Sequence, residues 1–288
     1  MDLALLTIIV IWAANFSIVK LSLETITPAA FNAIRFSAAT AIVLLATKVA
    51  GDNLRIEKHD LVRLALAGLM GTTVYQLLFI NGIALTTAGN SSLMLGGVPV
   101  YVSFLNAATG QENLNRHGWI GCLLAFGGIV LVVIGSGQSI DVRGESLLGT
   151  LLVLVAAVSW SGYTVISRPL LQRYSSLKVT GLSMLTGTLI LLLATASEWL
   201  KQDWGNVPMQ GWLGLIYSTL LAVGLAYVIW NMSVKAVGST RTAIYGNLQP
   251  VTAMLIGWLW LGENIGWLQI VGTAVILIGV FLTQHSSV

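Results

Sequence analysis

Charge is scarce in this chain of 288 residues: charged side chains make up 9% of it, against about 25% in an ordinary soluble domain. Hydrophobic residues make up 56%, and the mean hydropathy is +0.86. A charge at the centre of a membrane-spanning helix is costly, so insertion into a bilayer explains this composition. The net charge of +3 is a property of loops and does not indicate nucleic-acid binding.

Acidic residues are absent from the middle of every long apolar stretch; all 11 Asp and Glu residues lie at stretch ends or in loops. A proton-coupled exporter of cationic drugs usually needs a titratable carboxylate inside the membrane. This absence disfavours such an exporter and favours neutral or zwitterionic substrates.

Cysteine and histidine are rare too. Cys122 is the single cysteine and is expected to be a buried packing residue, while the three histidines lie outside the apolar stretches. The chain has no nucleophile–base constellation, no phosphate-binding glycine loop and no Cys/His metal spacing. We therefore expect no enzyme activity, no metal and no cofactor.

Long apolar stretches are what the chain has in abundance. A membrane-spanning helix needs about 20 mostly apolar residues, and ten such stretches are present. These are spans 1 to 10, and they begin near Leu3, Pro28, Leu61, Ala88, Gly118, Leu147, Leu177, Gly211, Ser239 and Ile265. The sequence predicts an all-α integral membrane protein with ten transmembrane helices.

The second half of the chain repeats the first at a shift of 151 residues. The matched pairs are Pro99 with Pro250, Glu112 with Glu263, Gly121 with Gly272 and Gly128 with Gly279. A weaker match at a shift of 148 pairs Trp12 with Trp160. We expect two five-helix repeats, 1–138 and 139–288. An odd number of spans per repeat makes them antiparallel, and exchange between two such halves gives alternating access.

Basic residues are distributed unevenly between the two sides. With a cytoplasmic N-terminus, the inner side holds ten of them, Lys48, Arg55, Lys58, Arg63, Arg116, Arg168, Arg173, Lys178, Lys235 and Arg241. The outer side holds Lys20, Arg143 and Lys201. This bias predicts that both termini are cytoplasmic.

Several motifs resemble those of a known family. In span 2, Pro28 is followed by an aromatic residue and then by Arg35 and Phe36. The fourth span of each repeat carries a proline and has a glutamate at its end, namely Pro99 with Glu112 and Pro250 with Glu263. Over essentially the whole chain this resembles the drug/metabolite transporter superfamily, EamA type. The resemblance implies a secondary transporter of the bacterial inner membrane, and chain length and aromatic content are most similar to the aromatic amino-acid exporters.

Spans 4 and 9 carry helix-breaking residues at matching positions: Gly96, Gly97 and Pro99 in one, Gly246 and Pro250 in the other. Proline removes a backbone hydrogen bond, and interrupted helices in both halves indicate a midplane binding site. The alternative is a purely structural kink with close glycine packing.

Polar and aromatic residues inside the spans are the candidates for a substrate cavity. They are Trp12, Asn15, Tyr75, Phe79, Asn81, Tyr101, Trp160, Tyr163, Trp230, Tyr245 and Gln249. Amides can hold a zwitterion, and aromatic rings can stack on a flat apolar substrate. Helix–helix hydrogen bonds and ordinary aromatic packing are the alternatives. We expect spans 1, 3, 4, 6, 8 and 9 to line the cavity, with spans 5 and 10 peripheral.

Arg35 is the one basic residue clearly inside a span. Snorkelling of its guanidinium to the outer surface is one interpretation, and contact with helix-end carbonyls or a substrate carboxylate is the other.

The sequence therefore predicts an exporter of amino acids, aromatic and other neutral ones, whose partners are a small-molecule substrate and the lipid bilayer. The alternatives are the nucleotide-sugar or sugar-phosphate branch, for which several cavity-facing basic residues are expected, and a drug exporter of the same superfamily. A membrane enzyme needs clustered His or Asp, and an assembly partner needs no polar midplane, so both fit less well.

Overall fold

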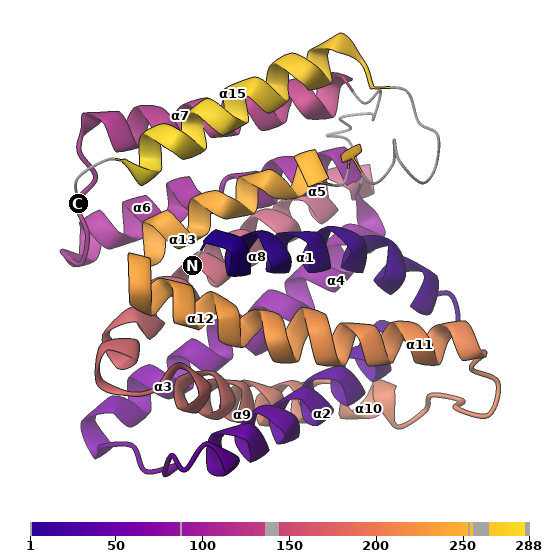
Figure 1. The fold of residues 1–288 in the computed structure, drawn as a ribbon. Coiled ribbons are helices and arrows are strands. Elements are labelled where there is room, and N and C mark those ends of the chain that lie inside the picture. The colour runs from indigo at the N-terminus through magenta and orange to yellow at the C-terminus, as the bar shows by residue number, and fades with distance from the viewer. Residues whose placement is uncertain (1, 87, 136–143, 253, 256–264, 286–288) are drawn as a thin grey trace. The chain divides into compact units, whose positions relative to one another are not determined.

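The computed structural model describes residues 2–86, 88–135, 144–252, 254–255 and 265–285, and every regular element among them is a helix (Figure 1). The α-helices are α1 (Asp2–Ser22), α2 (Pro28–Val49), α3 (Leu61–Gly68), α4 (Tyr75–Leu85), α5 (Ala88–Gly96), α6 (Val98–Thr109), α7 (Arg116–Gly135), α8 (Gly144–Arg173), α9 (Ser176–Ala194), α10 (Ala196–Trp199), α11 (Met209–Tyr217), α12 (Ala226–Val237), α13 (Ser239–Ile244) and α15 (Trp267–Gln284). The 3₁₀ helices are η1 (Lys58–Asp60) and η4 (Tyr245–Leu248), and two segments are π-helical, η2 (Leu69–Val74) and η3 (Ser218–Leu225).

Each of the ten expected spans begins within three residues of the first residue of a helix. Among the described residues, seven helical stretches are long and apolar enough to cross a membrane. They are Pro28–Val49, Lys58–Ile83, Arg116–Gly135, Leu147–Arg173, Ser176–Ala194, Met209–Val237 and Trp267–Gln284. The protein is therefore a multi-pass helical membrane protein.

The chain forms two compact units, and each combines segments from both halves of the sequence. Unit 1 comprises Met1–Leu77 and Ile166–Ala236, and unit 2 comprises Leu78–Val165 and Val237–Val288. The boundaries fall inside α4 and α8 and before the last residue of α12. The units are thus divided differently from the sequence repeats, whose limits remain a prediction.

Unit 1 is built around α2 and α9, which lie side by side. Both π-helical segments pack against this pair, η3 against α2 and η2 against α9. Small residues allow the close approach: a Cβ atom on Gly187 would lie 2.2 Å from the carbonyl oxygen of Gly68. The glycines therefore bring α3 and α9 into backbone contact.

Unit 2 contains one helix pair with especially extensive packing, α7 against α15 (Figure 1). A Cβ atom on Gly121 would lie 2.7 Å from the Gly279 carbonyl oxygen, and one on Gly128 would lie 2.7 Å from the Gly272 carbonyl oxygen. Residue numbers rise along α7 as they fall along α15, so the two helices are antiparallel. In the sequence repeat, Gly121 matches Gly272 and Gly128 matches Gly279. In the structure, Gly121 contacts Gly279, and Gly128 contacts Gly272. Each glycine of α7 therefore contacts the repeat counterpart of the other glycine of α7.

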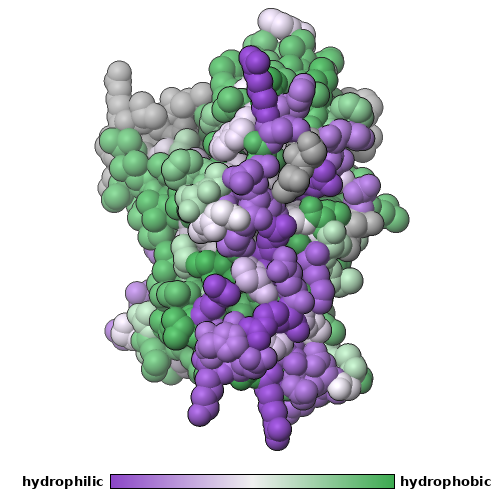
Figure 2. Space-filling view, turned by 90° about the vertical axis from the view of Figure 1, so that its left-hand side faces the viewer, coloured by the Kyte–Doolittle hydropathy of each residue, from purple (hydrophilic) through white to green (hydrophobic). Residues whose placement is uncertain are grey.

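Many large apolar side chains remain on the surface, and on the face drawn in Figure 2 hydrophobic areas lie beside hydrophilic ones. Leu123 and Ile134 of α7 and Ile270 and Phe281 of α15 are all exposed. Exposed apolar surface on this scale indicates contact with lipid.

Candidate functional site

Span 4 is broken into two helices within unit 2. Helix α5 ends at Gly96 and α6 begins at Val98, with Gly97 between them and Pro99 in the first turn of α6. Proline fits a first turn because its missing N–H has no intrahelical partner there. A side chain on Gly97 would collide with Tyr101, since its Cβ would lie 2.4 Å from the hydroxyl oxygen.

Span 9 is interrupted at the corresponding position, also in unit 2. Helix α13 ends at Ile244 and η4 follows, before helical structure resumes at Gln249 and Pro250. Asn247 lies within η4 and is 1% exposed, yet neither its Oδ1 nor its Nδ2 has a hydrogen-bond partner. A buried amide without a protein partner is costly, which makes Asn247 a candidate for contact with a polar ligand.

The predicted cavity residues of unit 2 include one aromatic pair. The ring centroids of Trp160 and Tyr163 on α8 lie 5.1 Å apart, and both side chains are buried. Tyr245 is buried too. Of the other four predicted cavity residues in this unit, Phe79, Tyr101 and Gln249 are half-buried and Asn81 is exposed.

The predicted cavity residues of unit 1 include a second pair. The rings of Trp12 and Trp230 lie 5.4 Å apart. The indole Nε1 of Trp12 donates to the Ala222 carbonyl oxygen at 2.9 Å, inside the π-helical η3. Asn15 and Tyr75 are half-buried. π-helical turns occur often at functional sites, and this one receives a side chain from α1.

Arg35 lies at the centre of a polar cluster in unit 1. The residue is 4% exposed, and its guanidinium donates from Nη1 to Ser218 Oγ at 3.0 Å. Its Nη2 donates to Asn32 Oδ1 at 2.6 Å and to Gln76 Oε1 at 2.7 Å. Gln76 in turn donates to the Tyr227 hydroxyl at 3.2 Å. The cluster joins α2 to the helices that follow both π-helical segments.

The guanidinium of Arg35 therefore does not snorkel to the surface. Its Cζ lies 5.1 Å from the ring centroid of Phe31 and 5.0 Å from that of Phe36, so two aromatic faces stabilise the cation. Its partners are neutral oxygens, and Nε has none. The sequence offers one local signal for this cluster, Asn32 one turn before Arg35; Ser218 and Gln76 reach it only through the tertiary fold.

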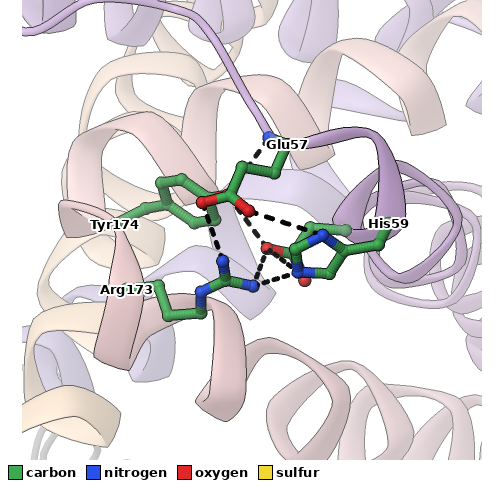
Figure 3. Close-up of polar contacts among 5 residues, drawn as sticks. Glu57, His59, Arg173 and Tyr174 are labelled. Carbon is green, nitrogen blue, oxygen red and sulfur yellow. Dashed lines mark hydrogen bonds and ion pairs between the residues drawn. The ribbon is translucent and has the colours of Figure 1, made fainter.

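A second polar cluster lies at the predicted cytoplasmic side of unit 1 (Figure 3). Glu57, His59 and Asp60 precede α3, and Arg173 and Tyr174 lie at the end of α8. Arg173 pairs with Glu57 at 2.8 Å and with Asp60 at 2.6 Å, and its Nη1 also contacts the His59 ring. The Tyr174 hydroxyl donates to Asp60 at 2.9 Å. These contacts fasten the segment before α3 to the end of α8.

A neighbouring ion pair extends this attachment to α9. Lys178 Nζ lies 2.9 Å from Asp52 Oδ1 and donates to Asn53 Oδ1 at 3.1 Å. Ser175, the N-cap of α9, donates its hydroxyl to Asp52 Oδ2. The hydrogen bond from Ser175, together with that from Lys178, lowers the pKa of the Asp52 carboxyl below its usual value.

The eleven predicted cavity residues divide between the two units: four lie in unit 1 and seven in unit 2. Within a unit the structure brings together the pairs Trp12 with Trp230 and Trp160 with Tyr163. Across the described part of the chain, no group of three or more His, Cys, Asp or Glu side chains is placed to bind a metal ion.

Comparison with known proteins places this geometry in a family context. The sequence profile of the EamA-like transporter family matches residues 1–134 and 147–284. The uncharacterized transporter YyaM of Bacillus subtilis is 25% identical over 272 residues, covering 93% of this chain and 88% of the relative. A protein of Streptantibioticus cattleyicolor, named a probable terminal-alkyne amino-acid exporter, is 28% identical over 284 residues, covering 98% and 92%. One crystal structure superposes with a TM-score of 0.80 at 20% identity, covering 97% of this chain and 94% of the other.

Proposed function

Because the chain belongs to the EamA-like transporter family, we propose that it exports neutral amino acids, with aromatic ones as the best substrates. The family and the relatives are transporters, so the protein is a transporter and not an enzyme. Its setting is a membrane, and we assign it to the bacterial inner membrane with both termini in the cytoplasm, on the basic-residue asymmetry.

The observation that carries this proposal is the interruption of spans 4 and 9 at matching positions. The break at Gly97 and the 3₁₀ turn Tyr245–Leu248 both leave backbone without regular α-helical bonding. Such segments are tolerated at membrane depth where they line a polar site, and in transporters they bind substrate. We assign substrate binding to this region, and Gly96, Gly97, Pro99, Gly246 and Pro250 to the hinges.

Aromatic substrates are favoured by the side chains near these breaks. In unit 2, which holds both breaks, Trp160 and Tyr163 supply flat apolar surfaces that suit a phenyl or indole group. Unit 1 holds a second aromatic pair, Trp12 with Trp230. One relative is named as an exporter of an amino acid, which supports the same substrate class.

We further propose ten spans in two inverted repeats that work by alternating access. The reciprocal glycine contacts between α7 and α15 support the inversion, because an antiparallel pair in which each residue meets the other's counterpart is what a two-fold axis produces. These two helices are spans 5 and 10, and their exposed apolar faces support a peripheral position.

The other branches of the superfamily fit less well. A nucleotide-sugar or sugar-phosphate carrier needs several basic groups for its anion, whereas Arg35 already donates to three neutral oxygens. An exporter of cationic drugs needs an acidic group within the membrane, and none of the Asp and Glu residues lies mid-span.

Counterflow in liposomes tests the proposal. Purified protein is reconstituted into vesicles loaded with unlabelled phenylalanine, and uptake of radiolabelled phenylalanine is followed. We expect accumulation that excess tryptophan or tyrosine inhibits strongly and threonine weakly. Uptake no faster than in protein-free vesicles, for phenylalanine and threonine alike, would refute an amino-acid exporter.

A further inference from the structure

A buried carboxylate connects the two broken spans in unit 2. Glu112 follows α6 and is 4% exposed. Its Oε1 accepts the backbone N–H of Ser239 at 2.9 Å and the Ser239 hydroxyl at 3.1 Å. Its Oε2 accepts the backbone N–H of Thr240 and the side-chain amide of Asn106, both at 3.1 Å. We call this set Glu112, Asn106, Ser239 and Thr240 the Glu112 clasp.

The local sequence around residue 238 is adapted to the carboxylate. Gly238 has φ +91°, and a Cβ atom there would lie 2.6 Å from Glu112 Oε1, so any other residue would strain the backbone and displace the carboxylate. The next two residues direct their N–H groups at the carboxylate. Helix starts leave such N–H groups without intrahelical partners, and an ionised acceptor forms strong bonds with them.

Asn106 completes the clasp from α6. Its Nδ2 lies 2.8 Å from the Ser239 hydroxyl oxygen and 3.0 Å from that of Thr240. All four residues are buried. The carboxylate therefore accepts hydrogen bonds from donors on both α6 and α13.

The clasp lies at the ends of α6 and α13 that are opposite to the two breaks. Helix α6 starts just after the break at Gly97, and the clasp lies past its opposite end. Helix α13 runs into the 3₁₀ turn at Tyr245, and the clasp lies at its opposite end, its start. Each helix is interrupted at one end, so the bonds at its other end are placed to hold α6 and α13 together.

We propose that the Glu112 clasp is the latch of a gate at the predicted cytoplasmic face. While it is formed, α6 and α13 are held together and the route from that face is closed; substrate enters only after the carboxylate releases Ser239 and Thr240. Glu112 is thus a positioning residue that touches no substrate. The inference rests on the proposed transport function.

Side-specific labelling tests the latch without any substrate. A single cysteine replaces Tyr101 in a Cys122→Ser background, and a membrane-impermeant maleimide is added to right-side-out or inside-out vesicles. Glu112→Gln keeps the shape but removes the charge, which weakens the hydrogen bonds that the carboxylate accepts. We expect labelling from the cytoplasmic side to rise about tenfold and labelling from outside to fall. The matched control Thr109→Ala, which removes an exposed hydroxyl at the end of α6, should change neither rate.

Equal labelling of Glu112→Gln and the parent from both sides would overturn the latch. A rise from both sides would overturn it as well, because it would identify Glu112 as a fold stabiliser whose loss loosens the protein.

A reversible cross-link provides the second measurement. Asn106→Cys and Ser239→Cys in the same background are bridged by a short thiol-specific linker. We expect cross-linking to lower the rate of phenylalanine counterflow at least tenfold and cleavage of the linker to restore that rate. Failure to cross-link, or full transport by the cross-linked protein, would show that the contact is absent or static. If the parent protein, with Asn106 and Ser239 intact, moves no phenylalanine, the substrate proposal fails, and the labelling experiment still decides on the latch.

Discussion

The hydroxyl oxygens of Thr40 and Thr188 lie 3.1 Å apart in unit 1, although 148 residues of chain separate them. Thr47 and Thr195 have the same spacing, and each donates to the carbonyl oxygen four residues before it at 2.8 Å. Residues at equivalent places in two copies of a repeat meet each other where a two-fold axis passes between the copies. This contact therefore supports the inverted arrangement from within unit 1, as the glycine contacts support it from within unit 2.

The glycine contacts lead to a stability prediction. Gly128→Ala should lower the free energy of unfolding by about 1–3 kcal/mol, because the new methyl group would lie 2.7 Å from the Gly272 carbonyl oxygen. Gly127→Ala is the matched control, since nothing lies within 4 Å of its Cβ position. Thermal unfolding in detergent compares the two variants. Equal melting temperatures would contradict the close packing.

Arg35→Lys should destabilise unit 1. A single ammonium cannot reach Ser218, Asn32 and Gln76 together, and hydrogen bonds to a charged group are worth about 1.5–3 kcal/mol each, so a loss of about 3 kcal/mol is expected. Arg63→Lys, at an exposed position of α3, is the control. Thermal unfolding and substrate KM are measured together. A raised KM with an unchanged melting temperature would instead assign Arg35 to a substrate carboxylate.

The lowered pKa of Asp52 predicts a pH dependence. A carboxyl group whose folded-state pKa lies below its unfolded value contributes stability above the unfolded pKa of about 4, and this stability is lost as pH falls through the folded-state pKa. Asp52→Asn should lower the melting temperature at pH 7 and flatten its decline below about pH 4. Melting temperatures from pH 3 to 8 provide the measurement. Parallel curves for the two proteins would show that Asp52 adds nothing.

Substrate selectivity should depend on the aromatic pairs. Trp160→Ala should weaken phenylalanine transport several-fold while sparing threonine, because a lost aromatic contact costs about 1 kcal/mol. Tyr163→Ala should act in the same direction, and Trp160→Phe should retain most of the selectivity. Competition between the two substrates in liposomes measures this. An equal loss for both substrates would mean that the pair only packs the helix.

Topology is predicted from the basic residues. In a Cys122→Ser background, a cysteine at Gly205 should react with an impermeant maleimide in intact cells, and one at Lys58 should react only after permeabilisation. Both positions are exposed in the structure, so a difference in labelling reports which side of the membrane each one faces. The reverse pattern would invert the assignment of the termini.

The sequence located the helices well, because apolar length and turn residues are local properties. Starts expected near Pro28, Ala88 and Ser239 coincide with the starts of α2, α5 and α13. The break in span 4 was also foreseeable, since Gly97 and Pro99 mark it directly.

The π-helical segments and the clasp were not foreseeable. A π-turn changes which residues along the backbone are bonded, and neither Leu69–Val74 nor Ser218–Leu225 contains a residue type that marks it. The sequence identified Glu112 only as a residue at the end of a span. Its backbone partners Ser239 and Thr240 lie 127 and 128 residues further along the chain, and no local pattern indicates them. For the same reason, two of the three partners of Arg35, Ser218 and Gln76, emerged only from packing.

The division of the chain into units also bears on biosynthesis. Unit 1 needs residues up to Ala236 and unit 2 needs residues beyond Val237, so neither core closes when the first repeat leaves the ribosome. The early helices must wait in the bilayer with small and polar faces uncovered, Arg35 among them, until α11 and α12 arrive. A partly folded intermediate with exposed polar helix faces therefore persists while roughly the second half of the chain is translated. During that time membrane chaperones and quality-control proteases have access to it.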